Sequence, residues 1–305
     1  MTENERYLFD LQGYVVVPNA LDAAEVAALN SIVDTQIAAL PDGDWSTHRF
    51  MEPLTWGAPF RDVIDHPRLL PYVQEIVAPQ VRIDHTYLDI IRSGLSPIGA
   101  RLHGGRVPFD SLQYFNYVEG RFYNGLSVVA INLMDVSCGD GGFGCVPGSH
   151  KSNLPFPEAW KDLQEPKPFV DRVAGPAGTA IIFTEALTHG PLPWNGTAER
   201  RTLFYKYVPF GMHHGDAAYD TNDPELTERQ KRILEFSPCW FNEPREDRDY
   251  SANPALTQLH PLARVESDPS VLLPGMSPPH IRLTDETRAK LLSDDGRGAS
   301  TNAKA

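Results

Sequence analysis

The stretch LMDVSCGDGGFGCVPGSHK, residues 133–151, is rich in glycine and lies in the middle of the most strand-like part of the chain. Apolar and β-branched segments on either side of it are separated by further Gly/Pro turns, and they cover residues 81–91, 126–136, 179–183 and 201–208. No helical repeat lies between these segments. Strands spaced in this way predict an antiparallel sandwich or barrel and argue against βαβ units.

The region before these strands, about residues 1–80, carries helical signals. A short β-branched run at Tyr14–Val17 ends at a proline, and Asp22 and Glu25 have the spacing of a capping box. Apolar residues at steps of three or four follow, and this pattern predicts a helix that ends near Pro41. We expect this region to support the strands.

The region after the strands is rich in proline and has few periodic runs. Residues 211–293 are therefore expected to form a peripheral cap of loops and short helices, and residues 294–305 a frayed tail. Together these patterns predict a single domain over residues 1–293 with a β core over about residues 81–210.

Composition limits the partners and the compartment. The 305 residues include 27 Lys and Arg against 40 Asp and Glu, a formal net charge of −13 that disfavours nucleic acid and anionic membrane surfaces. No apolar run approaches the roughly 18–20 residues of a membrane-spanning helix, and the N-terminus is acidic where a secretory signal would be basic. Three cysteines without a CxxC pair do not make a disulfide framework. We expect a cytoplasmic protein that acts on a small molecule; the sequence leaves the oligomeric state open.

Two of the ten histidines stand apart by their context. His103 precedes two glycines, and His189 ends an apolar strand and precedes Gly190. Both lie at strand-to-turn junctions, where a ring can face a cavity while small neighbours admit a ligand. Arg200 and Thr202 begin the next strand, and their spacing of two places them on one face, where guanidinium and hydroxyl can bind one carboxylate. The alternative interpretation is an exposed Arg200–Arg201 pair.

Residues 133–151 resemble the stretch of the phytanoyl-CoA dioxygenase family in which an aspartate is followed by Gly and then by Pro-Gly-Ser-His. The opening GYVVVPNAL, followed by a capped helix, looks like that family's N-terminus, and the segment from Phe183 through His189 to Arg200 is similar to its distal histidine and 2-oxoglutarate arginine. The resemblance implies a mainly β fold with flanking helices and a double-stranded β-helix (jelly-roll, cupin-like) core. It also implies Fe(II), 2-oxoglutarate and O₂.

Carried over to this chain, the resemblance makes His103 and His189 the iron ligands and Arg200 the residue that holds 2-oxoglutarate, with Thr202 beside it. It also implies turn-forming, structural roles for Asp135, Pro147, Gly148 and Ser149, with His150 closing the turn. One position departs from the family pattern. Gly105 stands where the family has an aspartate ligand, and glycine has no side chain to offer a metal.

Glu185, four residues before His189, is the nearest substitute. On a straight strand the two Cα atoms would be about 13 Å apart, so direct ligation by both needs a bulge between them. Glu185 is therefore a candidate catalytic residue with three open roles: third ligand, neighbour of the ligands or of the substrate, or exposed or structural residue. Asp110 is a more distant candidate. If the position stays open, water or chloride can fill it.

Three functions follow from these alternatives. The first is a 2-oxoglutarate-dependent dioxygenase that hydroxylates, or otherwise oxidises, a C–H bond of a small molecule. The second is a halogenase of the same class, with chloride at the position that Gly105 vacates. The third is a jelly-roll binding protein without catalysis. Four further residues are candidates for lining the substrate pocket: Tyr87, Gln113, Tyr114 and Trp194.

Overall fold

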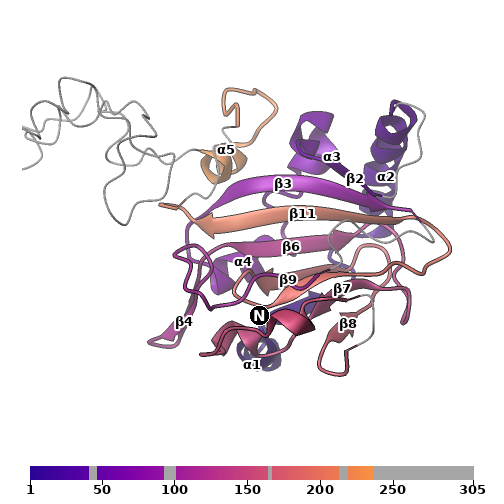
Figure 1. Cartoon of the computed structure of the whole chain (residues 1–305). Coiled ribbons are helices and arrows are strands. Elements are labelled where there is room, and N and C mark those ends of the chain that lie inside the picture. Colours follow the sequence, from indigo (N-terminus) through magenta and orange to yellow (C-terminus); the bar gives the residue numbers. More distant parts are fainter. Residues whose placement is uncertain (41–46, 93–100, 164–166, 213–218, 236–305) are drawn as a thin grey trace, which may run out of the picture. The chain divides into compact units, whose positions relative to one another are not determined.

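A six-stranded antiparallel sheet forms the centre of the computed structural model (Figure 1). The structure describes residues 1–40, 47–92, 101–163, 167–212 and 219–235. Across the sheet the strands are β1 (Tyr14–Val17), β9 (Ala180–Thr184), β6 (Ser127–Asn132), β11 (Arg200–Pro209), β3 (Val81–Ile91) and β2 (Thr47–Phe50). Every neighbouring pair is antiparallel, as the strand spacing predicted.

A smaller sheet packs against one face of this sheet. Its strands, in order, are β10 (His189–Leu192), β7 (Gly142–Cys145) and β8 (Asp171–Val173). An apolar cluster joins the two sheets, with Val128 and Phe183 from the large sheet packed against Phe143 and Cys145 from the small one. A separate hairpin is formed by β4 (Phe115–Val118) and β5 (Arg121–Asn124). The two-sheet sandwich is therefore confirmed.

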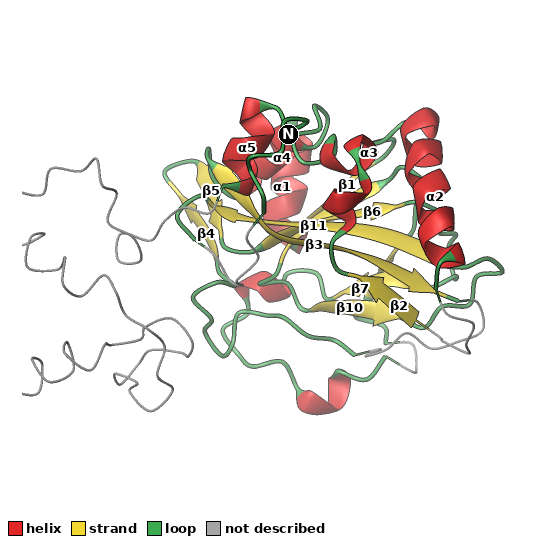
Figure 2. Cartoon of the chain, turned by 90° about the horizontal axis from the view of Figure 1, so that it is seen from above, coloured by secondary structure: helices red, strands yellow, loops and turns green. Residues whose placement is uncertain are grey.

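Helices cover the opposite face of the large sheet (Figure 2). They are α1 (Glu3–Gln12), α2 (Ala23–Ala38), the 3₁₀ turn η1 (Pro53–Trp56), α3 (Ala58–Arg61), α4 (Leu70–Ile76) and α5 (Glu228–Leu234). The predicted capping box of Asp22 and Glu25 starts α2, and both of its hydrogen bonds are present. Two further 3₁₀ turns, η2 (Ser149–Lys151) and η3 (Glu158–Trp160), lie in the segment of the chain that connects β7 to β8.

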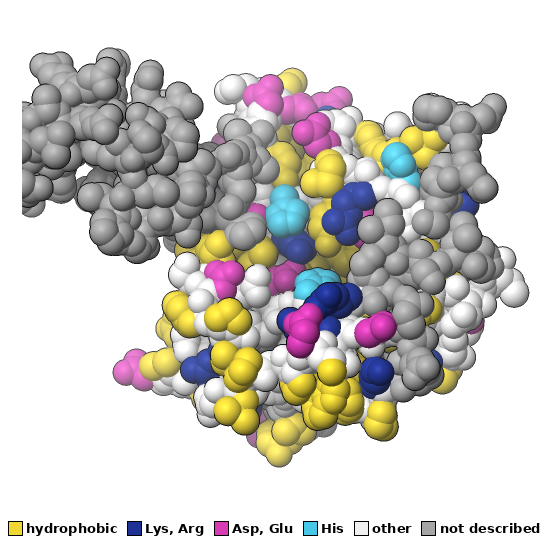
Figure 3. All heavy atoms as spheres, in the orientation of Figure 1, with side chains coloured by type: hydrophobic (Ala, Val, Ile, Leu, Met, Phe, Trp, Pro, Cys, Tyr) yellow, Lys and Arg dark blue, Asp and Glu magenta, His cyan; other side chains and the backbone are white. Residues whose placement is uncertain are grey.

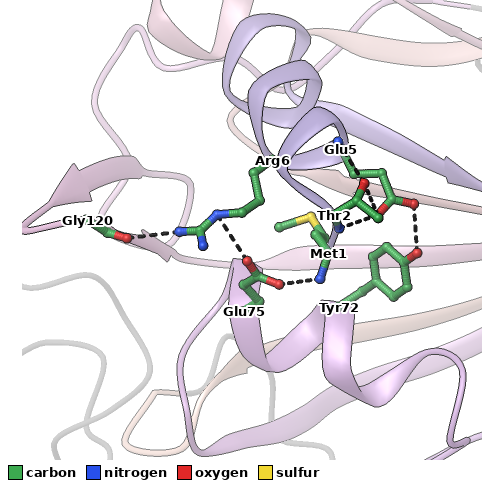
Figure 4. A network of polar contacts seen from close by, with 7 residues as sticks. All are labelled: Met1, Thr2, Glu5, Arg6, Tyr72, Glu75 and Gly120. Carbon is green, nitrogen blue, oxygen red and sulfur yellow. Dashed lines mark hydrogen bonds and ion pairs between the residues drawn. The ribbon is translucent and has the colours of Figure 1, made fainter.

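The N-terminal helix is fastened to its surroundings by polar contacts (Figure 4). The Tyr72 hydroxyl of α4 donates to Glu5 at 2.8 Å, and Glu75 pairs with both the N-terminal amino group and Arg6. Arg6 also donates to the carbonyl of Gly120 in the β4–β5 turn at 3.0 Å. These contacts hold α1 against α4 and the β4–β5 hairpin.

The glycine-rich stretch 133–151 leads from β6 of the large sheet into β7 of the small sheet and then passes next to α1. Gly148 adopts φ +80°, a conformation that glycine adopts without strain, and η2 follows it. His150 lies buried with Nε2 3.0 Å from the carbonyl of Asp10, so its ring ties this turn to α1. A Cβ on Gly13 would lie 2.5 Å from His150 Nδ1, so only glycine leaves room for the ring.

The described chain belongs to one compact unit, Met1–Phe236, and the second unit is Ser237–Ala305. All residues of the second unit lie outside the described part of the chain. The predicted tail 294–305 and most of the predicted cap 211–293 therefore fall outside it as well. Cys138 and Cys145 are free thiols, and Cys239 is not described.

Candidate functional site

The site is built on a cross-strand pair of histidines. His103 and His189 are directly paired in an antiparallel bridge, with N–H···O distances of 2.7 and 2.9 Å in the two directions. Directly opposed residues point to the same face of a sheet, and the two ring centroids lie 4.4 Å apart. Two histidines far apart in the sequence thus become immediate neighbours, as the resemblance implied.

Backbone carbonyls orient both rings. His189 Nδ1 lies 2.7 Å from the carbonyl oxygen of Leu187, and His103 Nδ1 lies 3.2 Å from that of Arg101. A carbonyl only accepts, so each Nδ1 carries the proton and each Nε2 keeps a lone pair in the neutral ring. Burial lowers the pKa of His189 to about 4, so its ring is neutral at physiological pH. This is the arrangement of metal-binding histidines.

Glu185 lies beside His189 because the chain turns between them. β9 ends at Thr184, and the amide of Leu187 donates to the Thr184 carbonyl at 2.9 Å, which closes a turn before β10 begins. This turn replaces the bulge that the i, i+4 spacing required. Glu185 Oε2 lies 3.8 Å from His189 Nε2.

The other oxygen of Glu185 is paired with Lys206, a residue that sequence analysis missed. Lys206 Nζ lies 2.6 Å from Glu185 Oε1, and both side chains are largely buried. Burial alone would raise the pKa of Glu185, but its neighbours His189, Lys206 and His103 outweigh burial and lower this pKa. Lys206 acts through both its charge and its hydrogen bond, and its own pKa is raised by Glu185 despite its burial. Alternate residues of a strand point to the same face, so counting in steps of two from Arg200 would have placed Lys206 on the face of the site.

Arg200 and Thr202 lie on that same face of β11, as predicted, and both are buried. Arg200 Nε and Thr202 Oγ1 have no hydrogen-bond partner. No carboxylate of the described residues lies within 4.0 Å of the guanidinium. Burial lowers the pKa of Arg200 to about 10, yet the group stays charged at pH 7. A buried cation with no carboxylate close to it is costly, so Arg200 is a candidate for binding an anionic ligand.

Arg201, by contrast, faces the other side of the strand. It pairs with Asp34 at 2.6 Å and with Glu199 at 2.6 Å, and it donates to Asn30 at 3.0 Å. The alternative of an exposed Arg200–Arg201 pair is therefore wrong. Arg200 is buried on the face of the site, and Arg201 forms its ion pairs on the opposite side of the strand.

The backbone around Gly105 does not have the extended conformation of a strand. Gly104 and Gly105 have φ values of +72° and +106°, and the Gly105 amide donates to the Glu185 carbonyl at 3.3 Å. A Cβ on Gly104 would lie 2.7 Å from the carbonyl oxygens of Glu185 and Leu187. The glycines thus let the chain wrap closely around the turn that carries Glu185. An aspartate at position 105 would be strained there.

Among the described residues, no three His, Cys, Asp or Glu side chains converge closely enough to form a complete metal site as they stand. His103, His189 and Glu185 are nevertheless two nitrogen donors and one carboxylate, the donor types of a facial triad for non-haem Fe(II). Ligand atoms at right angles on an ion with bonds of about 2.1 Å lie about 3.0 Å apart, and the 3.8 Å between Glu185 and His189 closes to this by a small side-chain movement. The donor set therefore fits the metal.

The remaining candidates have other surroundings. Trp194 is buried in a small apolar cluster, and its indole donates to the Ala198 carbonyl at 2.7 Å, so it is structural. Tyr114 lines a surface pocket of about 280 Å³ together with Arg106 and Phe109. Tyr87 lies on β3 within the site. In Figure 3, histidine, basic and acidic side chains gather in one hollow on the face that is shown.

Comparison with solved structures shows the same fold. HygX from Streptomyces hygroscopicus, with nickel and 2-oxoglutarate bound, superimposes with a TM-score of 0.64 and 23% identity over 74% of this chain and 95% of its own. HygX with nickel, 2-oxoglutarate and hygromycin B gives 0.62 and 24% over 72% and 93%. SnoN, a non-haem α-ketoglutarate-dependent epimerase from nogalamycin biosynthesis, gives 0.52 and 18% over 68% and 83%.

These similarities confirm the predicted jelly-roll core. Neither a family model nor a curated protein matches the sequence, so the resemblance to the phytanoyl-CoA dioxygenases stays a prediction. No helix in the described ranges is both long and apolar enough to span a membrane.

Proposed function

We propose that this protein is an Fe(II)- and 2-oxoglutarate-dependent oxygenase that acts on a small molecule. The observation that carries the proposal is Arg200, a buried guanidinium whose Nε has no hydrogen-bond partner, on the face of β11 that also carries Lys206, the partner of Glu185. The solved structures of the same fold include proteins described with iron or with 2-oxoglutarate bound, and this supports the choice of ligands.

His103, His189 and Glu185 would hold the iron, with Glu185 in place of the carboxylate that Gly105 does not supply. When bound, the iron supplies the chemistry by which O₂ oxidises 2-oxoglutarate to succinate and CO₂ and a substrate R–H to R–OH. The protein contributes two histidines whose Nε2 atoms are left to face a metal by the hydrogen bonds at Nδ1. It also contributes a carboxylate that stays ionised because Lys206 pairs with it.

Arg200 and Thr202 would hold the distal carboxylate of 2-oxoglutarate. The guanidinium is planar and offers two parallel donors, and the Thr202 hydroxyl is free to donate a further bond. Because both groups are buried, water competes little for these bonds, and the ligand replaces the solvation that Arg200 lost on folding.

Hydroxylation is favoured over halogenation by the charge at the site. A halogenase needs chloride at the position beside the two histidines. Here the ionised Glu185 lies 3.8 Å from His189 Nε2, and a second anion at the same place would be repelled.

Succinate formation in buffers that contain or lack chloride tests this function. We expect purified protein with Fe(II), 2-oxoglutarate and O₂ to form succinate at the same rate in chloride-free buffer as in chloride. A strict chloride requirement would support the halogenase, and no iron-dependent succinate in either buffer would leave a binding protein.

A further inference from the structure

A second set of polar groups lies on β3, next to the proposed metal site. Strand β11 pairs with β3 through a shift in register, so that Tyr207 opposes Ile83 while Lys206 opposes His85. Asp84 is the extra residue of this β-bulge. Bulges redirect side chains and are common beside active sites.

The bulge makes two adjacent residues act together. In a regular strand Asp84 and His85 would point to opposite faces, but here His85 Nδ1 lies 2.6 Å from Asp84 Oδ2. A carboxylate only accepts, so Nδ1 donates to it and the ring is held with Nε2 directed away. Asp84 is buried, whereas the side chain of His85 remains 26% exposed.

An aromatic row continues from His85 along the site face. The His85 ring stacks on Tyr87 at 5.9 Å and 17°, and Tyr87 stacks on Phe204 at 4.6 Å and 21°. Lys206 Nζ lies 5.6 Å from the Tyr87 centroid while it pairs with Glu185, so this row borders the metal site directly.

The charged side chains along this wall already have partners within the protein. Lys206 pairs with Glu185, Arg49 pairs with Asp89 through two bonds of 2.6 and 2.7 Å, and Asp84 accepts the hydrogen bond from His85. On the same two strands, the buried Arg82 donates to the backbone carbonyls of Met212 and Glu235, and Arg200 is the cation that the proposed function assigns to 2-oxoglutarate. Two uncommitted polar groups remain on the wall, His85 Nε2 and the Tyr87 hydroxyl, since neither makes a hydrogen bond within the described structure.

From this balance we infer that the β3 wall is the substrate-binding surface and that it selects a neutral, hydroxyl-bearing molecule. The Tyr87 hydroxyl and the His85 Nε2 form hydrogen bonds with a hydroxyl group, while the aromatic row packs against the carbon skeleton. A free carboxylate or ammonium would find no unpaired charge on this wall, and it would lose its hydration without compensation. The inference rests on the proposed function, because that function assigns Arg200 to the co-substrate.

Three matched six-membered rings test the inference: trans-1,2-cyclohexanediol, cyclohexanecarboxylate and cyclohexylammonium. Binding is measured by saturation-transfer difference NMR on the protein with Zn(II) and saturating 2-oxoglutarate. We expect the diol to bind at least about tenfold more tightly than either ion. The double variant His85→Phe/Tyr87→Phe keeps the aromatic row but removes both polar groups, and we expect it to bind the diol about tenfold more weakly.

The control is His48→Phe, which changes a histidine on β2 that opposes Ile90 and so lies on the helix-covered side of the same sheet. It should leave diol binding unchanged. Equal or tighter binding of either ion, or full diol binding by the double variant, would overturn the inference. The signal of 2-oxoglutarate in the same samples separates the two proposals: its absence counts against the proposed function, and its presence with no preference for the diol counts against the inference alone.

Discussion

The two faces of β11 have opposite characters. Leu203, Tyr205 and Tyr207 point into the helix-covered core, where the hydroxyls of both tyrosines donate to backbone carbonyls. Arg200 and Thr202, on the other face, are equally buried but keep polar atoms without partners. Along β11, residues whose polar groups have hydrogen-bond partners therefore alternate with residues whose polar groups lack them. We expect the first set to stabilise the fold and the second set to bind ligand. Substitutions on one face should change unfolding, and those on the other should change ligand binding.

The largest effect is expected at the histidine pair. His189→Ala removes one of two nitrogen donors and should reduce succinate formation to the level of the iron-free protein, while circular dichroism shows an intact fold. His150→Ala is the control, since that buried histidine contacts Asp10 instead of the site. It should lower the melting temperature and keep turnover. Undiminished succinate formation by His189→Ala would refute the site.

Arg200→Ala should raise the KM for 2-oxoglutarate about ten- to hundredfold, since a charged bidentate contact contributes roughly 1.5–3 kcal/mol. Arg201→Ala, whose partners lie on the helix-covered side, should leave this KM unchanged. Initial rates at varied 2-oxoglutarate check both variants. Sensitivity at Arg201 instead would reverse the assignment of the two faces.

Leu203→Ala tests the satisfied face. This side chain is fully buried among the helices, so its truncation should lower the free energy of unfolding by about 2–5 kcal/mol. The KM for 2-oxoglutarate should stay within twofold of the parent at a temperature where the variant is folded. Chemical denaturation and initial rates measure the two quantities, and a large rise in KM with little loss of stability would contradict the separation of the faces.

Lys206→Met leaves Glu185 buried without its cation, which costs about 3–5 kcal/mol in comparable pairs. Because bound Fe(II) would supply the missing positive charge, anaerobic addition of Fe(II) should raise the melting temperature of this variant more than that of the parent. Lys206→Arg should behave like the parent. An equal shift in all three proteins would show that Glu185 does not face the metal.

The smallest effect is expected for Thr202→Val. The hydroxyl has no partner in the protein, so its removal should not destabilise the ligand-free fold. The KM for 2-oxoglutarate should nevertheless rise severalfold, because a single neutral hydrogen bond contributes about 0.5–1.5 kcal/mol. Thermal melts with and without 2-oxoglutarate would reveal this difference, and a loss of stability without ligand would place the hydroxyl in a structural role.

The sequence predicted the strands and the helix caps because these are local properties. The strand over residues 81–91, the capping box at Asp22 and the shared face of Arg200 and Thr202 all follow from spacing along the chain. The pairing of His103 with His189 was implied by the resemblance alone, because a long-range bridge has no local signature.

The sequence left one feature open and missed two others, for physical reasons. The proximity of Glu185 to His189 depends on a turn that closes only when β9 and β10 join different sheets. From the sequence alone, Lys206 is indistinguishable from a solvated surface charge, because its partner Glu185 lies beside it only in the folded protein. The Asp84–His85 pair depends on a register shift between two strands more than a hundred residues apart, which no window of sequence contains.

An anaerobic visible spectrum tests most directly whether 2-oxoglutarate binds beside a metal at this site. Protein with Fe(II) and 2-oxoglutarate should develop the weak charge-transfer band of the chelated complex. The band should be retained in Arg201→Ala and should need far more 2-oxoglutarate in Arg200→Ala. A parent protein that shows no band at saturating Fe(II) and 2-oxoglutarate would contradict the account.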